Sequence, residues 1–180
     1  MSKIILITGG QRSGKSRYAE ELALRLSDTP VYVATAHIWD EEFRHRVLMH
    51  QQRRGPQWTN IEEERLLSRH DLTGRVAVID CVTLWCTNFF FDPSSPTSPS
   101  QEEWHIIVAD ALAALKSEFD LFTSHDATYI FVTNELGSGG VSENVVQRHF
   151  TDLQGWANQY IAEKADEVIL MVCGIPVKIK

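Results

Sequence analysis

The sequence predicts an α/β fold in which a mostly parallel sheet is covered by helices on both faces, within a single domain spanning residues 1–180. Short apolar runs of strand length recur along the chain and alternate with segments of helical periodicity. Such alternation is typical of parallel strands joined by crossover helices. The second observation is size, because 180 residues, 43% of them hydrophobic, suffice for one core but not for two ordinary domains.

The predicted strands begin at residues 4–8, a continuous apolar run of the kind found in strands that are buried on both faces. A glycine-rich turn follows, and then Tyr18, Leu22 and Leu26 at helical spacing, so this stretch predicts strand, loop and helix in that order. Four further apolar runs predict strands at residues 31–34, 76–79, 129–133 and 168–172.

Further helices are predicted between these runs. Residues 39–54 are charged but periodic, and residues 145–164 also have helical spacing. In the first of these segments one face carries Phe43, Val47, His50 and Arg54. A core-facing helix is indicated by apolar residues at Trp104, Val108, Ala111, Leu112 and Leu115. Residues 92–100 hold three prolines and four serines, so they predict an exposed loop.

The composition of the chain argues against nucleic-acid binding and membrane association. The net charge of -7 and the pI near 5.5 disfavour binding to nucleic acid or to an anionic membrane, both of which need clustered positive charge. No stretch approaches the roughly 20 apolar residues of a membrane helix. We therefore expect a cytoplasmic protein that acts on small molecules. Cys81, Cys86 and Cys173 have no metal-ligand spacing and are expected to be buried, reduced thiols.

Residues 9–16 read GGQRSGKS and fit the pattern G-x-x-x-x-G-K-[ST], directly between the first predicted strand and its helix. In that context the pattern predicts a phosphate-binding loop (P-loop), because backbone N–H groups and the helix N-terminus then face phosphate oxygens. The predicted fold is accordingly P-loop NTPase-like. Lys15 would contact the outer phosphates and Ser16 would bind Mg²⁺. The candidate loop residues are Gly9, Gly10, Gln11, Arg12, Ser13, Gly14, Lys15 and Ser16. The alternative is an ordinary glycine-rich turn, which the flanking strand and helix disfavour.

Polar groups follow two other predicted strands. Asp80 ends the apolar run 76–79, as expected for the carboxylate that orients Mg²⁺ beside a P-loop. The alternative is a helix cap before residues 83–88. Asn134 and Glu135 precede a glycine turn after the strand 129–133, and should lie near the same edge of the sheet. On residue chemistry alone, that cluster is equally consistent with a plain connecting loop.

His50 differs from the other six histidines because it directly precedes the run Gln51, Gln52, Arg53 and Arg54. A histidine flanked by two arginines could attack the α-phosphorus of a bound nucleotide while the guanidinium groups hold its phosphates. His37, His45 and His149 also lie near charged residues, so spacing alone leaves the role of His50 open.

Over essentially its whole length the chain resembles the bifunctional adenosylcobinamide kinase and adenosylcobinamide-phosphate guanylyltransferase family of cobalamin biosynthesis. The P-loop alone is common to many enzymes, but the ordered set of segments is much more specific. These segments are ITGGQRSGKSRYAE, VYVATA, RVLMHQQRRGPQWTNIEE, VIDCVTLWCTN, VTNELGSGG, RHFTDLQGWANQYIAEKADEV and GIPVKIK.

This resemblance implies two reactions. The aminopropanol hydroxyl of adenosylcobinamide is phosphorylated by ATP or GTP, and GMP from GTP is then attached to that phosphate through a GMP-histidine intermediate at His50, with loss of pyrophosphate. The Mg²⁺ predicted above at Ser16 and Asp80 would neutralise charge on the leaving pyrophosphate, and the resemblance implies a homotrimer. The implied nucleotide contacts are the P-loop, Ala34, Thr35, Ala36, Gln51, Gln52, Arg53, Arg54, Glu62 and Asp80.

Two departures from the family pattern lie in predicted loops. Gly55 separates the paired arginines from the following proline, and Ser142 replaces the usual proline after the Asn-Glu motif. Two rival functions are a P-loop kinase of another small hydroxyl substrate with no covalent intermediate, and a nucleotide-dependent switch without chemistry on a metabolite. Turnover of adenosylcobinamide would contradict the switch, which would at most hydrolyse GTP slowly.

Overall fold

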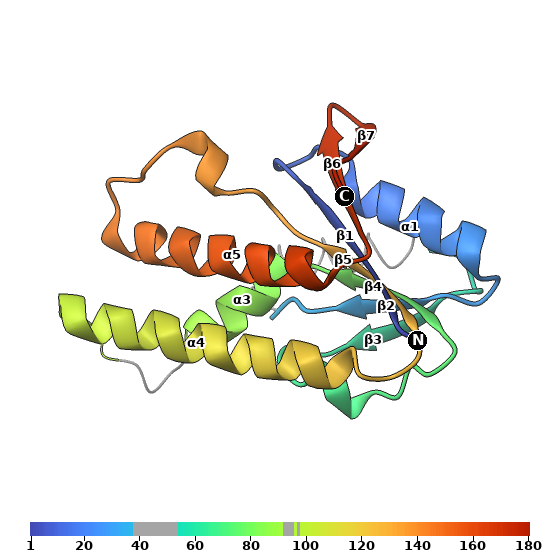
Figure 1. Ribbon diagram of the computed structural model, residues 1–180, viewed down its shortest axis with the longest axis horizontal. Helices are drawn as coiled ribbons and strands as arrows, with labels where there is room; N and C mark the ends of the chain where they lie inside the picture. Colours follow the sequence, from blue (N-terminus) through green and yellow to red (C-terminus); the bar gives the residue numbers. More distant parts are fainter. Residues whose placement is uncertain (38–53, 92–95, 97) are drawn as a thin grey trace.

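The computed structural model describes residues 1–37, 54–91, 96 and 98–180, and in them seven strands join one sheet in the order β3-β2-β4-β5-β1-β6-β7 (Figure 1). The strands are β1 (Lys3–Gly9), β2 (Val31–Ala34), β3 (Thr59–Glu62), β4 (Val76–Asp80), β5 (Thr128–Val132), β6 (Glu167–Val172) and β7 (Ile175–Lys178). All neighbouring pairs are parallel except β6 and β7. The predicted mostly parallel sheet is therefore confirmed.

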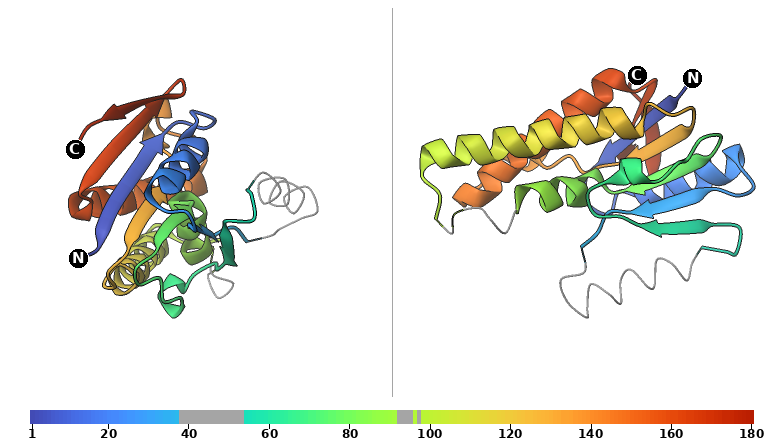
Figure 2. Two further views of the ribbon diagram at one scale, coloured as in Figure 1. Left: turned by 90° about the vertical axis from the view of Figure 1, so that its right-hand side faces the viewer. Right: turned by 90° about the horizontal axis from the view of Figure 1, so that it is seen from below.

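Helices cover both faces of this sheet, as predicted. The helix α1 (Lys15–Leu26) packs on one face, and α3 (Val82–Phe90), α4 (Gln101–Phe122) and α5 (Val145–Lys164) lie on the other (Figure 2). Alternate residues of β1 belong to the two cores: Ile5 and Ile7 pack with α1, whereas Ile4 and Leu6 pack with the other helices. Burial on both sides explains why β1 reads as a continuous apolar run.

Two edge strands were not predicted from the sequence, β3 and β7. Each lies at one end of the sheet, and most of its side chains are exposed. An edge strand needs no apolar run, because only one of its sides is paired and little of its surface enters the core. The pairing itself sets these strands: β3 follows β2 in parallel register, and β7 returns antiparallel along β6 after a tight turn.

The other predicted segments have mixed outcomes. The helices at 104–115 and 145–164 are confirmed as parts of α4 and α5, and α4 begins with a capping box formed by Ser100 and Glu103. Most of the predicted helix 39–54 and most of the predicted loop 92–100 lie outside the described residues. Arg54, the last residue of that helix prediction, lies in a bend. No helix in the described parts of the chain is long and apolar enough to cross a membrane.

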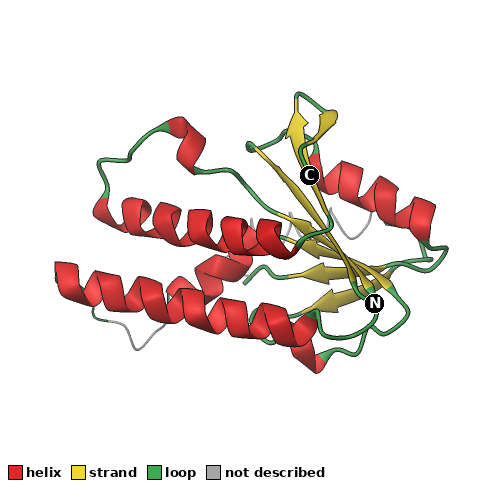
Figure 3. Ribbon diagram, in the orientation of Figure 1, coloured by secondary structure: helices red, strands yellow, loops and turns green. Residues whose placement is uncertain are grey.

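The parallel strands β1 to β5 end on the same side of the sheet, here called the carboxyl edge (Figure 3). The register brings Ala34, Asp80 and Val132 into one row across β2, β4 and β5, and Glu62 of β3 extends that row. Gly9 ends β1 two residues beyond the partner of Val132. Ligands of open α/β sheets bind at this edge, so the fold brings the predicted nucleotide residues together.

Candidate nucleotide site

The loop between β1 and α1 has the backbone geometry that a phosphate cradle requires. Gly9 has a φ of +145°, and a Cβ there would lie 2.5 Å from the Met171 carbonyl oxygen, so only glycine fits. Gly14 is the N-cap of α1 with a φ of +96° and has no side chain to cap the helix. The N–H groups of the first turn of α1 therefore remain available for an anion.

Lys15 lies over this loop. Its side chain is buried, and Nζ donates a hydrogen bond to the Gly10 carbonyl oxygen at 2.6 Å. Burial lowers the pKa of Lys15 below its ordinary value, and the negative charge of Asp80 opposes that effect. The lysine charge is thus fixed between the loop and the end of β4, where it can neutralise phosphate oxygens.

Asp80 occupies the position expected for a metal-orienting carboxylate, at the last residue of β4. Its Oδ2 accepts a hydrogen bond from the hydroxyl of Tyr32 at 2.8 Å. Together with the Ser16 hydroxyl at the start of α1, this carboxylate supplies hard oxygen donors of the kind Mg²⁺ prefers. Among the described residues, no three His, Cys, Asp or Glu side chains form a metal cluster. A bound Mg²⁺ usually has only one or two protein ligands, because nucleotide phosphates and water molecules supply the others.

Thr35 joins the ends of β2 and β4. It is fully buried, its Oγ1 donates to the Cys81 carbonyl oxygen at 2.7 Å, and the same oxygen accepts from the Cys81 N–H at 2.9 Å. The Thr35 carbonyl oxygen also accepts from Asn88 Nδ2 at 2.7 Å. The sequence indicated a nucleotide contact at this residue, and the structure shows in addition that its hydroxyl holds the carboxyl edge together.

Substitution of Thr35 by valine is expected to lower the free energy of unfolding by about 2 kcal/mol, because the isosteric side chain leaves the buried N–H of Cys81 without an acceptor, while the Cys81 carbonyl keeps the Trp85 N–H as its donor. Urea unfolding followed by circular dichroism measures the change. Thr73→Val is the matched control, since the Thr73 hydroxyl bonds Asp71 on an exposed turn. That control should cost less than about 0.5 kcal/mol, and an equally small cost at Thr35 would contradict the structural role of these bonds.

The Asn134–Glu135 segment lies next to the P-loop, as predicted for a strand end at the same edge. The Glu135 N–H donates to the Gly9 carbonyl oxygen at 3.2 Å, and Asn134 donates to the Thr83 hydroxyl through both its backbone N–H and Nδ2. The strand behind it is held by a buried polar network in which Gln154 and Asn158 of α5 bond each other and the Thr133 hydroxyl. These bonds fix the end of β5 beside the P-loop.

The C-terminal hairpin also reaches the P-loop. In the turn between β6 and β7, the Gly174 N–H donates to the Ser13 carbonyl oxygen at 3.0 Å. Cys173 lies in the same turn and is exposed, so the expectation that all three thiols are buried is wrong for this residue. The other two are buried, and burial raises the pKa of Cys81 to about 12, which keeps its thiol protonated.

Glu62 is the last residue of β3 and pairs with Ala34 of β2. The next two residues, Glu63 and Glu64, make contacts in the turn that follows. Glu63 accepts N–H bonds from Arg65 and Leu66, and its pKa is lowered by these bonds although burial acts in the opposite direction. Glu64 Oε1 lies 2.8 Å from His37 Nδ1. The turn that begins at Gly55 is closed by a bond from the Trp58 N–H to the Gly55 carbonyl. Glu62 is therefore in the row of strand ends, with the inserted glycine accommodated before β3.

The structure brings together most of the predicted nucleotide residues. The P-loop, Ala34, Thr35, Asp80 and Glu62 lie at or beside one edge, with Ala36 one residue further along the chain. The predicted nucleophile and the three residues after it, His50, Gln51, Gln52 and Arg53, lie outside the described residues. Arg54 is described, and its side chain is 3% exposed and stacked on Tyr32.

Several residues of this edge were not found from the sequence. Tyr32 reads as an ordinary strand residue, Thr83 as an ordinary helix residue, and the amides of α5 as part of its polar face. For Tyr32 and Thr83 the available signal was position, since Tyr32 lies two residues before Ala34 and Thr83 three residues after Asp80, whereas the α5 amides carry no such signal. Register across neighbouring strands, which sequence reasoning did not assign, is what relates Tyr32 to Asp80.

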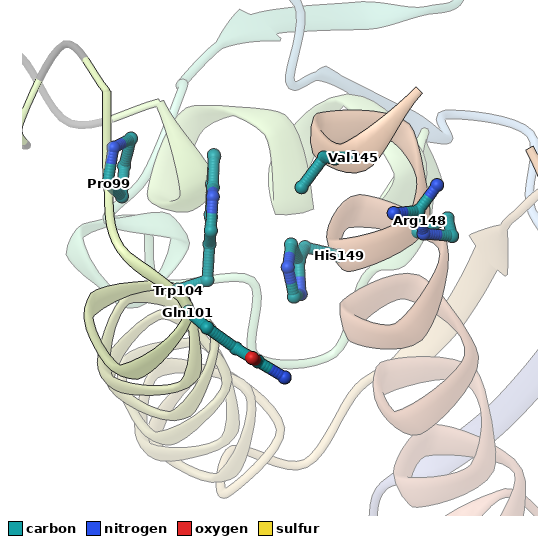
Figure 4. A pocket seen from close by; sticks show the side chains of 6 residues that line it. All are labelled: Pro99, Gln101, Trp104, Val145, Arg148 and His149. Atoms are coloured by element: carbon teal, nitrogen blue, oxygen red, sulfur yellow. The ribbon is translucent and has the colours of Figure 1, made fainter. Parts of the chain in front are cut away.

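A pocket of about 420 Å³ lies elsewhere, between the N-terminal ends of α4 and α5 (Figure 4). Trp104 and His149 stack in it with their ring centroids 5.0 Å apart. The lining residues are Pro99, Gln101, Trp104, Val145, Arg148 and His149. None of them belongs to the P-loop or to the strand ends of the carboxyl edge, so this pocket is distinct from the phosphate cradle.

Comparison with known proteins extends this picture. The bifunctional adenosylcobalamin biosynthesis protein CobU of Escherichia coli (strain K12) is 37% identical over 181 residues, covering 98% of this chain and 99% of the relative. CobU of Salmonella typhimurium is 38% identical, with the same coverage, and CobP of Pseudomonas aeruginosa is 34% identical over 97% and 96% of the two chains.

Among solved structures, a prototypical ATPase from the type III secretion system of pathogenic bacteria matches with a TM-score of 0.52 and 11% identity, over 93% of this chain and 50% of that one. At that identity the likeness shows the fold alone. The family model described as cobinamide kinase / cobinamide phosphate guanyltransferase matches residues 5–179. The chain belongs to this CobU family.

Proposed function

We propose that this chain phosphorylates adenosylcobinamide and then transfers GMP from GTP to adenosylcobinamide phosphate, with one P-loop domain over residues 1–180 serving both reactions. The observation that carries the proposal is the carboxyl edge itself, where Lys15 lies between a glycine-defined phosphate loop and Asp80 in a chain of this family. The relatives' names, bifunctional adenosylcobalamin biosynthesis proteins, point to the same pair of activities.

In the kinase reaction the substrate hydroxyl oxygen forms a bond to the γ-phosphorus of ATP or GTP, the bond to the β-phosphate oxygen breaks, and the hydroxyl proton is released. The P-loop N–H groups and Lys15 stabilise the charge that develops on the phosphate oxygens. Ser16 and Asp80 would hold Mg²⁺, which supplies further neutralisation of phosphate charge when bound. The phosphate donor of the kinase reaction is thus ATP or GTP. The donor of the guanylyl group is GTP, and the metal is Mg²⁺.

In the guanylyl transfer a ring nitrogen of His50 attacks the α-phosphorus of GTP, a P–N bond forms, and the bond to pyrophosphate breaks. A phosphate oxygen of adenosylcobinamide phosphate then attacks the same phosphorus, the P–N bond breaks, and neutral imidazole is restored. The products are adenosylcobinamide-GDP and pyrophosphate. A neutral imidazole is a good phosphorus nucleophile, and its phosphoramidate is labile enough to pass GMP onward.

The remaining assignments belong to the same proposal. The nucleotide is contacted by the P-loop together with Gln51, Gln52, Arg53 and Glu62. Arg54 is assigned to the same nucleotide site, and its guanidinium group lies over the ring of Tyr32. The enzyme forms a homotrimer, as the family resemblance implies, and acts in the cytoplasm, as expected from its composition. It binds neither nucleic acid nor membrane, in accord with its net charge of -7.

The proposal is tested by incubating the protein with adenosylcobinamide, Mg²⁺ and either ATP or GTP, and resolving the corrinoid products by chromatography with mass spectrometry. GTP is expected to give adenosylcobinamide-GDP with one pyrophosphate released per product. A phosphorylated corrinoid with no GDP product would support the kinase reaction and contradict the guanylyl transfer. Unchanged adenosylcobinamide would contradict the proposed function and support either the rival kinase of another small hydroxyl substrate or, if slow nucleotide hydrolysis is the activity observed, a switch protein.

A further inference from the structure

The hydroxyl of Tyr32 is hydrogen-bonded to the carboxylate of Asp80, at the end of the neighbouring strand β4. Tyr32 lies in β2 and is 5% exposed, and its hydroxyl donates to Asp80 Oδ2 at 2.8 Å. In the parallel register Tyr32 pairs with Val78, two residues before Asp80. Residues two apart share one face of a sheet, so the tyrosine ring runs along that face and its hydroxyl reaches the carboxyl edge. A shorter side chain at this position would not reach Asp80.

The ring of Tyr32 is fixed on both flanks. Trp58 meets it edge-on, with centroids 6.1 Å apart and an interplanar angle of 76°. The guanidinium carbon of Arg54 lies 3.5 Å from the ring centroid. Both contacts are buried, which strengthens the attraction between the cation and the ring. The hydroxyl is therefore held at one place, because the ring that carries it has little freedom to move.

Arg54 in turn is anchored to two other elements. Its Nε donates to Asn60 Oδ1 of β3 at 2.9 Å, and Nη1 lies 3.6 Å from Glu20 Oε1 of α1. The helix that comes after the P-loop, the edge strand β3 and the ring of Tyr32 are thus joined through one guanidinium group. A chain of buried contacts connects Arg54, through Tyr32, to Asp80.

We propose that Tyr32 is a positioning residue for the Mg²⁺–nucleotide complex: its hydroxyl holds Asp80 Oδ2 and so leaves Oδ1 for the metal or its water ligands. Arg54 acts through Tyr32 by clamping the ring that carries this hydroxyl. The inference rests on the proposed function in one respect, the assignment of Asp80 to the metal.

The hydroxyl is suited to this work because its 2.8 Å bond runs to a carboxylate oxygen, and a hydrogen bond to a charged acceptor is stronger than one between neutral groups. Phenylalanine would preserve the ring, the contact with Trp58 and the contact with Arg54, and would remove only the donor.

The test uses the whole protein and a fluorescent GTP analogue that is not turned over. Its affinity is measured without Mg²⁺, in EDTA, and across a Mg²⁺ titration, and Mn²⁺ binding to the protein–nucleotide complex is followed by electron paramagnetic resonance. For Tyr32→Phe the Mg²⁺ and Mn²⁺ midpoints are expected to rise about tenfold, the lower end of the scale of one lost net hydrogen bond to a charged group. Affinity in EDTA is expected to stay close to wild type, and the melting temperature is expected to fall no further than that of the control variant.

Tyr129→Phe is the matched control. Tyr129 is also a fully buried strand tyrosine, and its hydroxyl donates to the Phe122 carbonyl oxygen at 2.7 Å, at the opposite end of the sheet from the P-loop. This variant removes the same atom and a bond of similar length, so any general effect of losing a buried hydroxyl appears here too. Its metal midpoints are expected to equal those of wild type.

The outcomes separate this inference from the proposed function. If the wild-type protein binds GTP with a clear Mg²⁺ dependence and Tyr32→Phe shows the same midpoints, the positioning role is overturned and the proposed function stands. An equal loss of affinity with and without metal also overturns it, because the hydroxyl would then serve the nucleotide pocket as a whole. A wild-type protein that binds no guanine nucleotide overturns the proposed function itself.

Discussion

Replacement of His50 by alanine is expected to abolish guanylyl transfer, with a fall of about a thousandfold or more, while phosphorylation of adenosylcobinamide continues. The two reactions separate in this variant because only the second needs a nucleophile on the protein. Incubation with GTP labelled at the α-phosphorus, followed by denaturation and gel electrophoresis, measures the intermediate directly. The wild-type chain should retain label that is lost in acid and stable in base, as a phosphoramidate is.

His125→Ala is the control for this experiment, since His125 is an exposed histidine in the loop before β5. It should label like wild type. Added imidazole is expected to restore part of the transfer in the His50→Ala protein, because a free imidazole can take the place of the missing side chain. Label that persists in His50→Ala, or a wild-type protein that takes up none, would remove the covalent step from the mechanism.

Replacement of Lys15 by alanine is expected to lower the rate of both reactions by a factor on the order of 100 to 1000, the scale typical of losing one charged or hydrogen-bonding group that stabilises a transition state. The same ammonium serves both, because it lies over the P-loop and beside Asp80. Steady-state assays of each product, with nucleotide affinity measured separately, show whether the loss lies in binding or in transfer.

Lys116→Ala is the matched control, since Lys116 lies on α4 with its ammonium over the ring of Tyr160, on the helical layer away from α1. It should leave both rates within about twofold, as expected for a surface cation–π contact. If both reactions survived the loss of Lys15 at wild-type rates, the loop at residues 9–16 would not be the phosphate site.

The parts of the fold that could be predicted are those in which local sequence and buried environment agree. The run at residues 4–8 is apolar throughout because β1 is central and buried on both faces, and the P-loop comes after it, where a glycine turn meets a helix start. Asp80 was found because a carboxylate ending a buried strand is chemically conspicuous. In each case the residue types themselves carry the information.

The contacts that could not be predicted depend on which strands are neighbours. The link between Tyr32 and Asp80 joins residues 48 positions apart, and it exists because β2 pairs with β4 in one particular register. The bond between Gly174 and Ser13 spans almost the whole chain and results from the place of β6 beside β1. Spacing along the sequence does not encode either contact, whereas the sheet order creates both.

The position of β1 between β5 and β6 affects how the chain folds during its synthesis on the ribosome. The strand β1 is synthesised before both of these neighbours, because β5 begins only at Thr128 and β6 only at Glu167. Until both have been made, the anion-binding turn after β1 lacks its full lateral support. Formation of this turn therefore depends on strands that leave the ribosome long after it.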